Sequence, residues 1–318
     1  MQDLPLIEKY RPKILDDVVG NAYMIAQLKV IAKEGNMPNL IITGPPGTGK
    51  TTSVLSMAHQ MLQEYYGESL IELNASDDRG IEVVREKVKN FAQKQSTVPK
   101  NMSKIVVLDE ADSMTEAAQQ ALRKIMTDYS SNTRFALACN DSSKIIEPIQ
   151  SRCSIMRFSK LSDSDISKRL LQVIDIEKYQ YEKEGIEALI FTSDGDMRYA
   201  LNNLQSTIAA YGKVTQDNVF KICDIPKPGE LQEIIDMCCK GDILSAAIKA
   251  RTLWEAGYNL YDIIGSLSKL IQNSDKLNEK FKLEALKEVS LLKIRMAENL
   301  CTFTQLSGFL SRICLLSG

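Results

Sequence analysis

The residues with the most recognisable chemistry form a glycine-rich segment, Gly-Pro-Pro-Gly-Thr-Gly-Lys-Thr, at positions 44–51. The apolar run Leu40–Ile42 precedes it and a helix-compatible segment follows it. A strand that ends in such a turn and opens a helix directs backbone N–H groups, the helix dipole and one lysine at a single point. A polyphosphate fits that point, so we expect Lys50 to reach the β- and γ-phosphates of a nucleotide and the Thr51 hydroxyl to ligate Mg²⁺. A glycine turn that precedes a helix by chance is the competing interpretation.

Two acidic residues follow another apolar run further along the chain. Asp109 and Glu110 come directly after Ile105–Leu108, which has the composition of a buried parallel strand. In open parallel sheets, ligands bind beyond the carboxyl ends of the strands. Asp109 can therefore hold Mg²⁺, and Glu110 can orient and polarise an attacking water. Together with the P-loop, these acids predict nucleotide hydrolysis; an acidic loop in solvent is the alternative.

Two further residues are candidate sensors of the bound nucleotide. Asn140 ends the apolar run Phe135–Cys139, which would place its amide beside the acids, where it helps to position the water. Arg198 lies at the start of a predicted helix and would reach the γ-phosphate if a small domain folds over the site. A solvated surface charge is the alternative interpretation of a lone arginine.

Composition and charge restrict the remaining function classes. The chain has 318 residues, 44% of them apolar and 25% charged, which is enough for two or three domains. Its formal net charge of −2 means that any nucleic-acid binding must come from a local basic stripe. The seven cysteines include no C-x-x-C pair, which favours reduced thiols over disulfides or a zinc site. No signal peptide and no apolar stretch of membrane-spanning length is visible, so we expect no membrane partner.

Apolar strand candidates alternate with helical patterns up to about residue 160. This alternation predicts an α/β domain with a parallel sheet over residues 1–160. Two capping boxes, Ser113-x-x-Glu116 and Ser162-x-x-Asp165, predict helix starts. The strand candidates are Leu40–Thr43, Leu70–Leu73, Ile105–Leu108, Phe135–Cys139 and Ile155–Phe158.

Strand signals fade after residue 160. We expect a small helical domain over residues 161–226, which ends at the breaker cluster Pro226–Gly229. Residues 227–318 read as several amphipathic helices separated by Gly257 and Asn273-Ser274. The sequence therefore predicts three domains.

Several motifs in combination resemble the small subunits of replication factor C, the sliding-clamp loader of eukaryotes and archaea. The resemblance runs nearly end to end and is most specific up to residue 225. It is closest to the eukaryotic branch of that family. The segments that carry it are Glu8–Pro12, Asp17–Asn21, Asn74–Gly80, Asp109–Asp112, Ser151–Cys153 and Gly195–Arg198.

The resemblance implies an AAA+ P-loop NTPase with a five-stranded parallel sheet, a helical lid and an all-α collar that joins five subunits. It implies an ATP site in which Ile7 and Val19 line the adenine pocket, Asn140 is sensor 1 and Arg198 is sensor 2. Arg152 would be a finger that completes the ATP site of the neighbouring subunit in trans, so the isolated chain should be a poor ATPase. The residues expected to wrap the phosphates are Gly44, Pro45, Pro46, Gly47, Thr48, Gly49, Lys50, Thr51 and Thr52.

The same resemblance implies the partners. These are four other clamp-loader subunits, the sliding clamp and primer-template DNA, with ATP and Mg²⁺ as cofactors and the nucleus as the location. Arg79, Arg85 and Lys144 match family positions that contact template-strand phosphates; ordinary surface cations are the alternative. The implied task is to open the clamp and place it on primed DNA for replication and repair synthesis.

Three other functions compete with this interpretation. An RNA helicase of the Asp-Glu-Ala-Asp type needs a second α/β motor domain, whereas residues 161–318 read as helical. A homomeric AAA+ DNA motor of the Holliday-junction type shares the P-loop, finger and lid, but it would carry a winged-helix end that the last ninety or so residues do not suggest. A scaffold that binds ATP without turnover is disfavoured by the presence of Glu110, Asn140 and Arg198.

Overall fold

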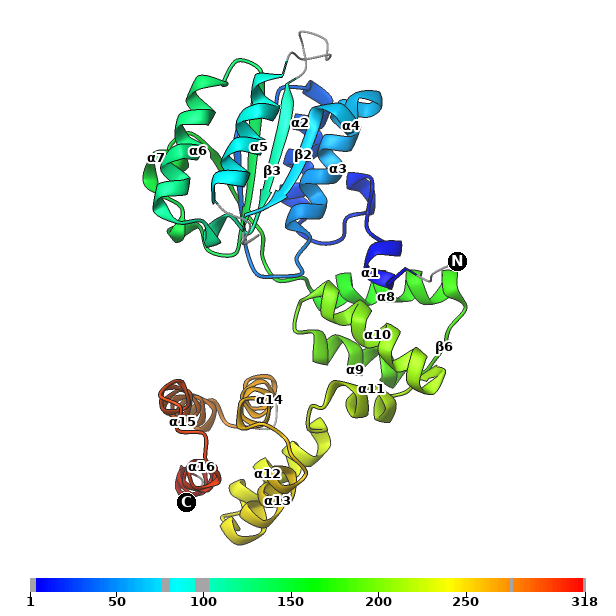
Figure 1. Cartoon of the computed structure of the whole chain (residues 1–318). Coiled ribbons are helices and arrows are strands. Elements are labelled where there is room, and N and C mark those ends of the chain that lie inside the picture. The colour runs from blue at the N-terminus through cyan, green and yellow to red at the C-terminus, as the bar shows by residue number, and fades with distance from the viewer. Residues whose placement is uncertain (1–3, 76–80, 95–102, 275–276, 317–318) are drawn as a thin grey trace. The chain divides into compact units, whose positions relative to one another are not determined.

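The computed structural model describes residues 4–75, 81–94, 103–274 and 277–316, with the side chains of residues 81–85 outside that description. The chain divides into two compact units, Met1–Val214 and Thr215–Gly318 (Figure 1). The finer division into three domains, with limits near residues 160 and 226, stays a prediction. Within the described ranges, no helix is both long and apolar enough to cross a membrane.

The first unit contains a five-stranded sheet in which every neighbouring pair is parallel. The strand order is β2-β3-β4-β1-β5, so the P-loop strand β1 lies between β4 and β5. This confirms the predicted parallel α/β fold, and each predicted strand is present to within two residues at either end. The strands are β1 (Leu40–Thr43), β2 (Leu70–Asn74), β3 (Lys104–Asp109), β4 (Thr133–Cys139) and β5 (Ser154–Arg157).

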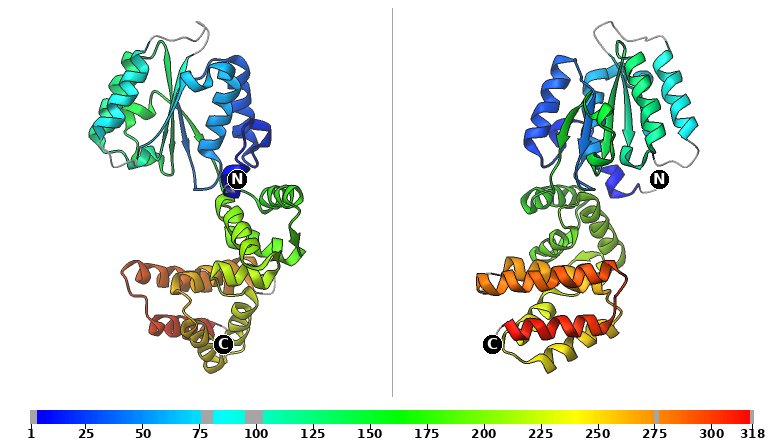
Figure 2. Two further views of the ribbon diagram at one scale, coloured as in Figure 1. Left: turned by 45° about the vertical axis from the view of Figure 1, so that its right-hand side comes forward. Right: turned by 90° about the vertical axis from the view of Figure 1, so that its left-hand side faces the viewer.

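Helices cover both faces of the sheet (Figure 2). One face packs on α2 (Ala22–Glu34) and α3 (Lys50–Leu62), and the other on α5 (Ile81–Gln93) and α6 (Glu116–Asp128). Successive residues of β3 alternate between the two cores, with Val107 in the first and Val106 in the second. Because both faces are covered, the strands read as continuous apolar runs in the sequence.

A helical part of the first unit follows the sheet. It contains α8 (Asp163–Glu177), α9 (Lys183–Ser193) and α10 (Met197–Tyr211), and helix α1 (Leu6–Lys9) packs against α10. We call α8–α10 the lid helices. Strand β6 (Gln180–Tyr181) lies between α8 and α9, and strand β7 (Lys213–Val214) follows α10. These two short strands pair with each other in a parallel ladder. The sequence did not predict this ladder, because two-residue strands are too short to show a periodic pattern.

One of the two predicted capping boxes is wrong. Helix α6 begins at Glu116, and its N-cap is Thr115, whose hydroxyl accepts the Ala118 N–H at 3.4 Å. Ser113 instead lies in a 3₁₀ turn and donates its hydroxyl to the Glu110 carbonyl at 2.7 Å. The second box is confirmed, since the Ser162 hydroxyl accepts the Asp165 N–H at 3.2 Å at the start of α8.

The second unit is helical, as the sequence predicts. Helix α12 starts at the breaker cluster, with Lys227 as N-cap and Pro228 as its first residue. Its apolar core joins α12 to α16 around Ile263, Leu292 and Phe309. The helices of this unit are α11 (Gln216–Cys223), α12 (Pro228–Cys239), α13 (Ile243–Glu255), α14 (Leu260–Asn273), α15 (Glu279–Ala297) and α16 (Phe303–Leu316); α4 (Tyr66–Ser69) and α7 (Glu147–Gln150) complete the first unit.

Candidate active site

The glycine-rich turn between β1 and α3 has the backbone geometry of a phosphate cradle. Gly47 and Gly49 have φ angles of 66° and 88°, in the left-handed region that favours glycine. A Cβ atom on Gly47 would lie 1.6 Å from an oxygen of Asp196, so only glycine fits where the turn meets lid helix α10. Helix α3 begins at Lys50, and its N-terminal N–H groups therefore face the same space as the turn.

Lys50 is almost fully buried at this turn. Its Nζ donates to the carbonyls of Gly44 and Pro45, both at 2.8 Å, and to Oδ1 of Asn140 at 3.0 Å. Burial lowers the pKa of Lys50, although the nearby Asp109 carboxylate acts in the opposite direction. All three hydrogen-bond acceptors are neutral, so an anionic phosphate would be a stronger partner for this cation.

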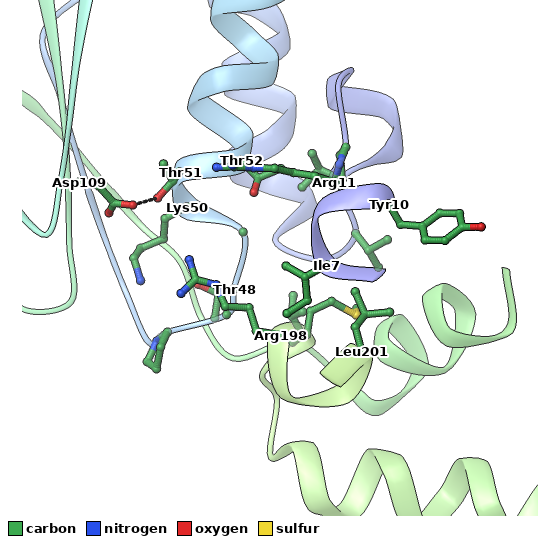
Figure 3. A pocket seen from close by; sticks show the side chains of 18 of the residues that line it. Ile7, Tyr10, Arg11, Thr48, Lys50, Thr51, Thr52, Asp109, Arg198 and Leu201 are labelled. Carbon is green, nitrogen blue, oxygen red and sulfur yellow. Dashed lines mark hydrogen bonds between the residues drawn. The ribbon is translucent and has the colours of Figure 1, made fainter. Parts of the chain in front are cut away.

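Asp109 and Thr51 bring oxygen atoms together at the end of β3. The Thr51 hydroxyl donates to Oδ2 of Asp109 at 2.9 Å (Figure 3). Carboxylate and hydroxyl oxygens are the ligands that Mg²⁺ prefers, and Mg²⁺ usually keeps several waters and binds substrate phosphates as well. The two side chains therefore fit a magnesium ion beside a nucleotide.

Glu110 occupies a strained backbone position next to Asp109. Its φ of 52° is in the left-handed region, which is uncommon for a residue other than glycine, and its N–H donates to Oδ1 of Asp109 at 2.9 Å. The side chain is exposed to the cavity and not packed in the sheet. Strain of this kind is often found where a residue must face a ligand.

Asn140 is held in place by a residue that the sequence did not single out for a role. Asp112 accepts the backbone N–H groups of Asn140 and Asp141 with one carboxylate oxygen, at 3.3 Å each. These bonds fix the loop after β4 against the loop after β3. The Asn140 amide thus faces Lys50 from a rigid backbone.

A second residue that the sequence did not indicate connects the loops after β3 and β4. Gln119 of α6 is 2% exposed, and its Nε2 donates to the carbonyls of Met114 and Lys144 at 3.1 and 3.0 Å. Its Oε1 accepts the Ile146 N–H at 2.8 Å. No local pattern reveals this role, because a glutamine in a helix usually reads as a surface residue.

Arg198 reaches the cavity from lid helix α10. Figure 3 shows its side chain extending toward the P-loop, and its positive charge is close enough to contribute to the lowered pKa of Lys50. Asp196 caps α10 by accepting the Arg198 N–H at 2.7 Å. The Met197 N–H donates to the Gly47 carbonyl at 3.2 Å, which links the lid directly to the P-loop.

A cavity of about 440 Å³ lies between the P-loop, the strand ends and the lid helices. Gly44 and Pro45 do not line it, and their carbonyls instead accept hydrogen bonds from Nζ of Lys50. The expected site residues that line it are Ile7, Val19, Pro46, Gly47, Thr48, Gly49, Lys50, Thr51, Thr52, Asp109, Glu110, Asn140 and Arg198.

The cavity has further walls that the sequence did not indicate. Tyr10 and Arg11 belong to a motif that carried the resemblance, but no role followed from it. Arg169, Met197 and Leu201 come from the lid helices, and only the folded chain brings them to this place.

Arg152 lies outside the cavity of its own chain. It follows α7, is exposed, and donates from Nη1 to the Pro148 carbonyl at 2.7 Å. The next residue, Cys153, packs against the core between the sheet and helices α5 and α6, and burial raises the pKa of its thiol to about 12. The candidate finger Arg152 therefore lies in a turn that the packing of Cys153 holds in place.

The three candidate DNA contacts are described unequally. Lys144 is exposed at the end of a 3₁₀ turn, Ser142–Lys144, outside the cavity. Arg79 lies outside the described residues, and so does the side chain of Arg85, whose backbone belongs to α5.

Two family models match the chain. Residues 40–161 match the ATPase family associated with various cellular activities (AAA), and residues 226–312 match the replication factor C C-terminal domain. Among solved structures, the RuvB Holliday junction branch migration motor of Thermotoga maritima is similar, with a TM-score of 0.55 and 16% identity over 72% of this chain and 78% of that one. At this identity the likeness concerns the fold alone.

Curated relatives cover nearly the whole chain. Replication factor C subunit 4 of Oryza sativa subsp. japonica is 54% identical, over 98% of this chain and 93% of that protein. Replication factor C subunit 4 of Saccharomyces cerevisiae is 52% identical over 98% and 95%. Probable replication factor C subunit 2 of Dictyostelium discoideum is 51% identical over 99% and 93%.

The parallel sheet, the P-loop and the acids at the end of β3 define an AAA+ P-loop ATPase, a fold that binds nucleotide. With relatives above 50% identity over nearly its full length, the chain belongs to the replication factor C small-subunit family. It is therefore a clamp-loader ATPase subunit of DNA replication, and its family works as a multisubunit complex.

Proposed function

We propose that this chain binds ATP with Mg²⁺ as one of five different subunits of a loader that opens the sliding clamp and places it on primed template DNA in the nucleus, for replication and repair synthesis. The observation that carries the proposal is the convergence of Lys50, Asn140 and the Asp109–Thr51 pair on a cavity that lid residue Arg198 also lines. Sheet and lid can both contact one nucleotide there, so its γ-phosphate can control their relative position.

The roles follow from charge and position. Lys50 and the N–H groups of the glycine-rich turn bind the phosphates, and Thr51 with Asp109 would hold Mg²⁺. The ion, when bound, supplies charge neutralisation at the β- and γ-oxygens. Glu110, exposed to the cavity, orients and polarises the attacking water.

Two groups act on the γ-phosphate from the sheet and from the lid. Asn140 lies within hydrogen-bond distance of Lys50 and helps to place the water. Arg198 stabilises the charge that develops on the transferred phosphoryl group. Hydrolysis removes the group that both contact, so the lid is released when the γ-phosphate leaves.

Arg152 completes the site of a neighbouring subunit. Its exposure, and its absence from the residues that line the cavity of its own chain, support a role in trans. An arginine supplied by a neighbour typically contributes about 10³–10⁵ in turnover. This arrangement makes hydrolysis depend on assembly.

Phosphate contacts with primed DNA are proposed for Lys144, Arg79 and Arg85. The exposure of Lys144 supports its part in this proposal. The net charge of −2 requires such a local contact and disfavours general affinity for nucleic acid.

Exposed apolar side chains support assembly through the second unit. Leu244 and Ile248 are 71% and 60% exposed on α13, and Leu283 is 71% exposed on α15. Apolar side chains of this size gain free energy when they are buried against another protein. We therefore propose that the helices after residue 227 form the collar that joins the subunits.

Glu110→Gln in the coexpressed five-subunit assembly tests the function. The variant keeps the size of the side chain but removes the carboxylate, so we expect ATP-dependent binding of clamp and primed DNA with turnover at this site reduced about 10²–10⁴-fold. Release of the loaded clamp, followed by fluorescence, should slow as well.

Glu116→Gln is the matched control, because Glu116 is exposed on α6 and does not line the cavity. It should leave turnover and release unchanged. If Glu110→Gln left the hydrolysis of the assembly unchanged, the chain would be a scaffold that binds ATP without turnover.

A further inference from the structure

The first helix is attached to the lid and not to the sheet. The backbone N–H of Leu6 donates to Oε1 of Gln205 on α10 at 2.9 Å, and the Leu6 side chain is 4% exposed. We call residues Leu6–Tyr10 the strap. Its first residue is therefore fixed to the last lid helix by both a hydrogen bond and apolar burial.

Glu177, the last residue of lid helix α8, holds the other end of the strap. One carboxylate oxygen accepts Nζ of Lys9 at 2.5 Å and the hydroxyl of Tyr10 at 2.6 Å. The hydrogen bonds from Lys9 and Tyr10 lower the pKa of Glu177, and the bond to Glu177 raises the pKa of Lys9, so both shifts indicate the same ion pair.

Arg169 makes a third connection from the middle of α8. Its Nη2 donates to the backbone carbonyl of Tyr10 at 2.6 Å, and the same residue lines the nucleotide cavity. Figure 3 shows Ile7 on the cavity side of this strap, with the Tyr10 ring directed away from the P-loop. The strap thus has one side on the cavity and the other on α8.

The chain changes its attachment directly after the strap. The Pro12 carbonyl accepts the hydroxyl of Ser56 on α3 at 3.0 Å, and Leu15 is fully buried in the core beneath α2 and α3. Between these attachments, the Arg11 N–H donates to the Glu8 carbonyl at 3.3 Å, and the ion pairs of its guanidinium with described residues are long, at 3.7 Å to Glu8 and 3.8 Å to Glu72. The chain therefore passes from its attachment to the lid to its attachment to the sheet at Arg11.

We propose that the strap moves as part of the lid and that Glu177 is a positioning residue for nucleotide binding, because it holds Ile7 against the base end of the nucleotide. Val18 and Val19 also line the cavity, and they belong to the segment attached to the sheet, where Val18 packs against the core of α2 and α3. The base then connects sheet to lid on its own, independently of the γ-phosphate. ATP and ADP both use this connection, whereas Arg198 responds to the γ-phosphate.

The inference rests on the proposed nucleotide site, and calorimetric titration of the full chain with ATP and with ADP, each with Mg²⁺, tests it. We expect Glu177→Ala to weaken both nucleotides to a similar extent, by about five- to tenfold, because two charge-assisted hydrogen bonds are lost. Tyr10→Phe removes one of these bonds and keeps the ring, so its effect should be smaller, about two- to threefold.

Two controls separate positioning from a general effect on the fold. Asp175→Ala removes an exposed acid of α8 two residues away and should leave both affinities unchanged. Glu177→Gln keeps an oxygen that can accept both bonds, so it should restore most of the affinity. Amide hydrogen exchange over residues 4–11 should be faster in Glu177→Ala than in Asp175→Ala, since the strap is then less firmly held.

Wild-type affinity for both nucleotides in Glu177→Ala would overturn the inference, and so would a loss confined to ATP. In either case we would still expect Lys50→Ala to abolish nucleotide binding. That result would support the proposed nucleotide site even though the role of the strap had failed. If Lys50→Ala bound ATP normally, the proposed site itself would be wrong, and the role of the strap would fall with it.

Discussion

Asp112 shows how one carboxylate can organise a site that it does not itself line. Its single oxygen accepts two successive N–H groups, of Asn140 and Asp141, and thereby sets where the Asn140 amide lies relative to Lys50. Hydrogen bonds from N–H groups to a carboxylate are stronger than those between neutral groups. We therefore propose a positioning role for Asp112, beside the chemical roles proposed for Asp109 and Glu110.

We predict that Asp112→Ala lowers kcat of the assembled complex about tenfold while KM for ATP changes little, because the Asn140 amide loses its fixed backbone but the phosphate contacts remain. Steady-state turnover measures both constants. Asp128→Ala, at an exposed position of α6, is the control and should match the wild type. A rise in KM with unchanged kcat would contradict the positioning role.

The sequence predicted the place in the fold of those candidate residues that follow directly after a strand, and their roles stay predictions. The P-loop and the acids after β3 follow directly from one strand each, so their place at the edge of the sheet could be inferred from the chain itself. Asp112, Gln119 and Arg169 act on segments 25 to 159 positions away. Their partners are set by the packing of strands and lid, which no local pattern reveals.

Among the elements, α6 joins two loops at the edge of the site through one side chain. Its buried Gln119 satisfies two carbonyls and one N–H group of the loops that carry the candidate catalytic residues and lead to Arg152. These loops also begin at the ends of β3 and β4. The Gln119 side chain therefore joins the two loops directly.

Gln119→Leu keeps the approximate volume of the side chain but leaves three backbone groups without their partner. Each buried unsatisfied group costs about 1–3 kcal/mol, and water can reach part of these loops after relaxation, so we expect a loss of about 2–4 kcal/mol in the stability of the first unit. Amide exchange at Ile146, whose N–H bonds to Gln119, should accelerate locally.

Gln120→Leu provides the control for this prediction, since Gln120 is exposed on the same helix. It should leave both the urea midpoint and the exchange at Ile146 as in the wild type. Equal exchange rates in the two variants would show that Gln119 does not hold the loops together.

The elements themselves were predictable to different degrees. The five strands of the sheet were found because continuous apolar runs mark strands that are buried on both faces. The start of α6 was misplaced, because Ser113 and Thr115 are both suitable N-caps and only the path of the chain after β3 decides between them. The attachment of α1 to the lid could not be predicted, because a helix of four residues is too short to show a periodic pattern in the sequence.

For the whole molecule, the described residues that line the proposed ATP site all belong to the unit Met1–Val214, and Arg152 is not among them. Arg152 is exposed and lies outside its own cavity, so an isolated chain should turn over ATP slowly. We therefore expect an enzyme whose activity depends on its neighbours.

The most direct test is ATP turnover by the chain coexpressed with its four candidate partners, with and without clamp and primed DNA, in the wild type and in Arg152→Ala. Arg123→Ala, at an exposed arginine of α6, is the matched control. Our prediction is strong stimulation by clamp and DNA, a clear loss of stimulated turnover in Arg152→Ala, and little turnover by the isolated chain. Robust turnover by the isolated chain, indifferent to the clamp and to Arg152→Ala, would contradict it and would favour a homomeric AAA+ motor.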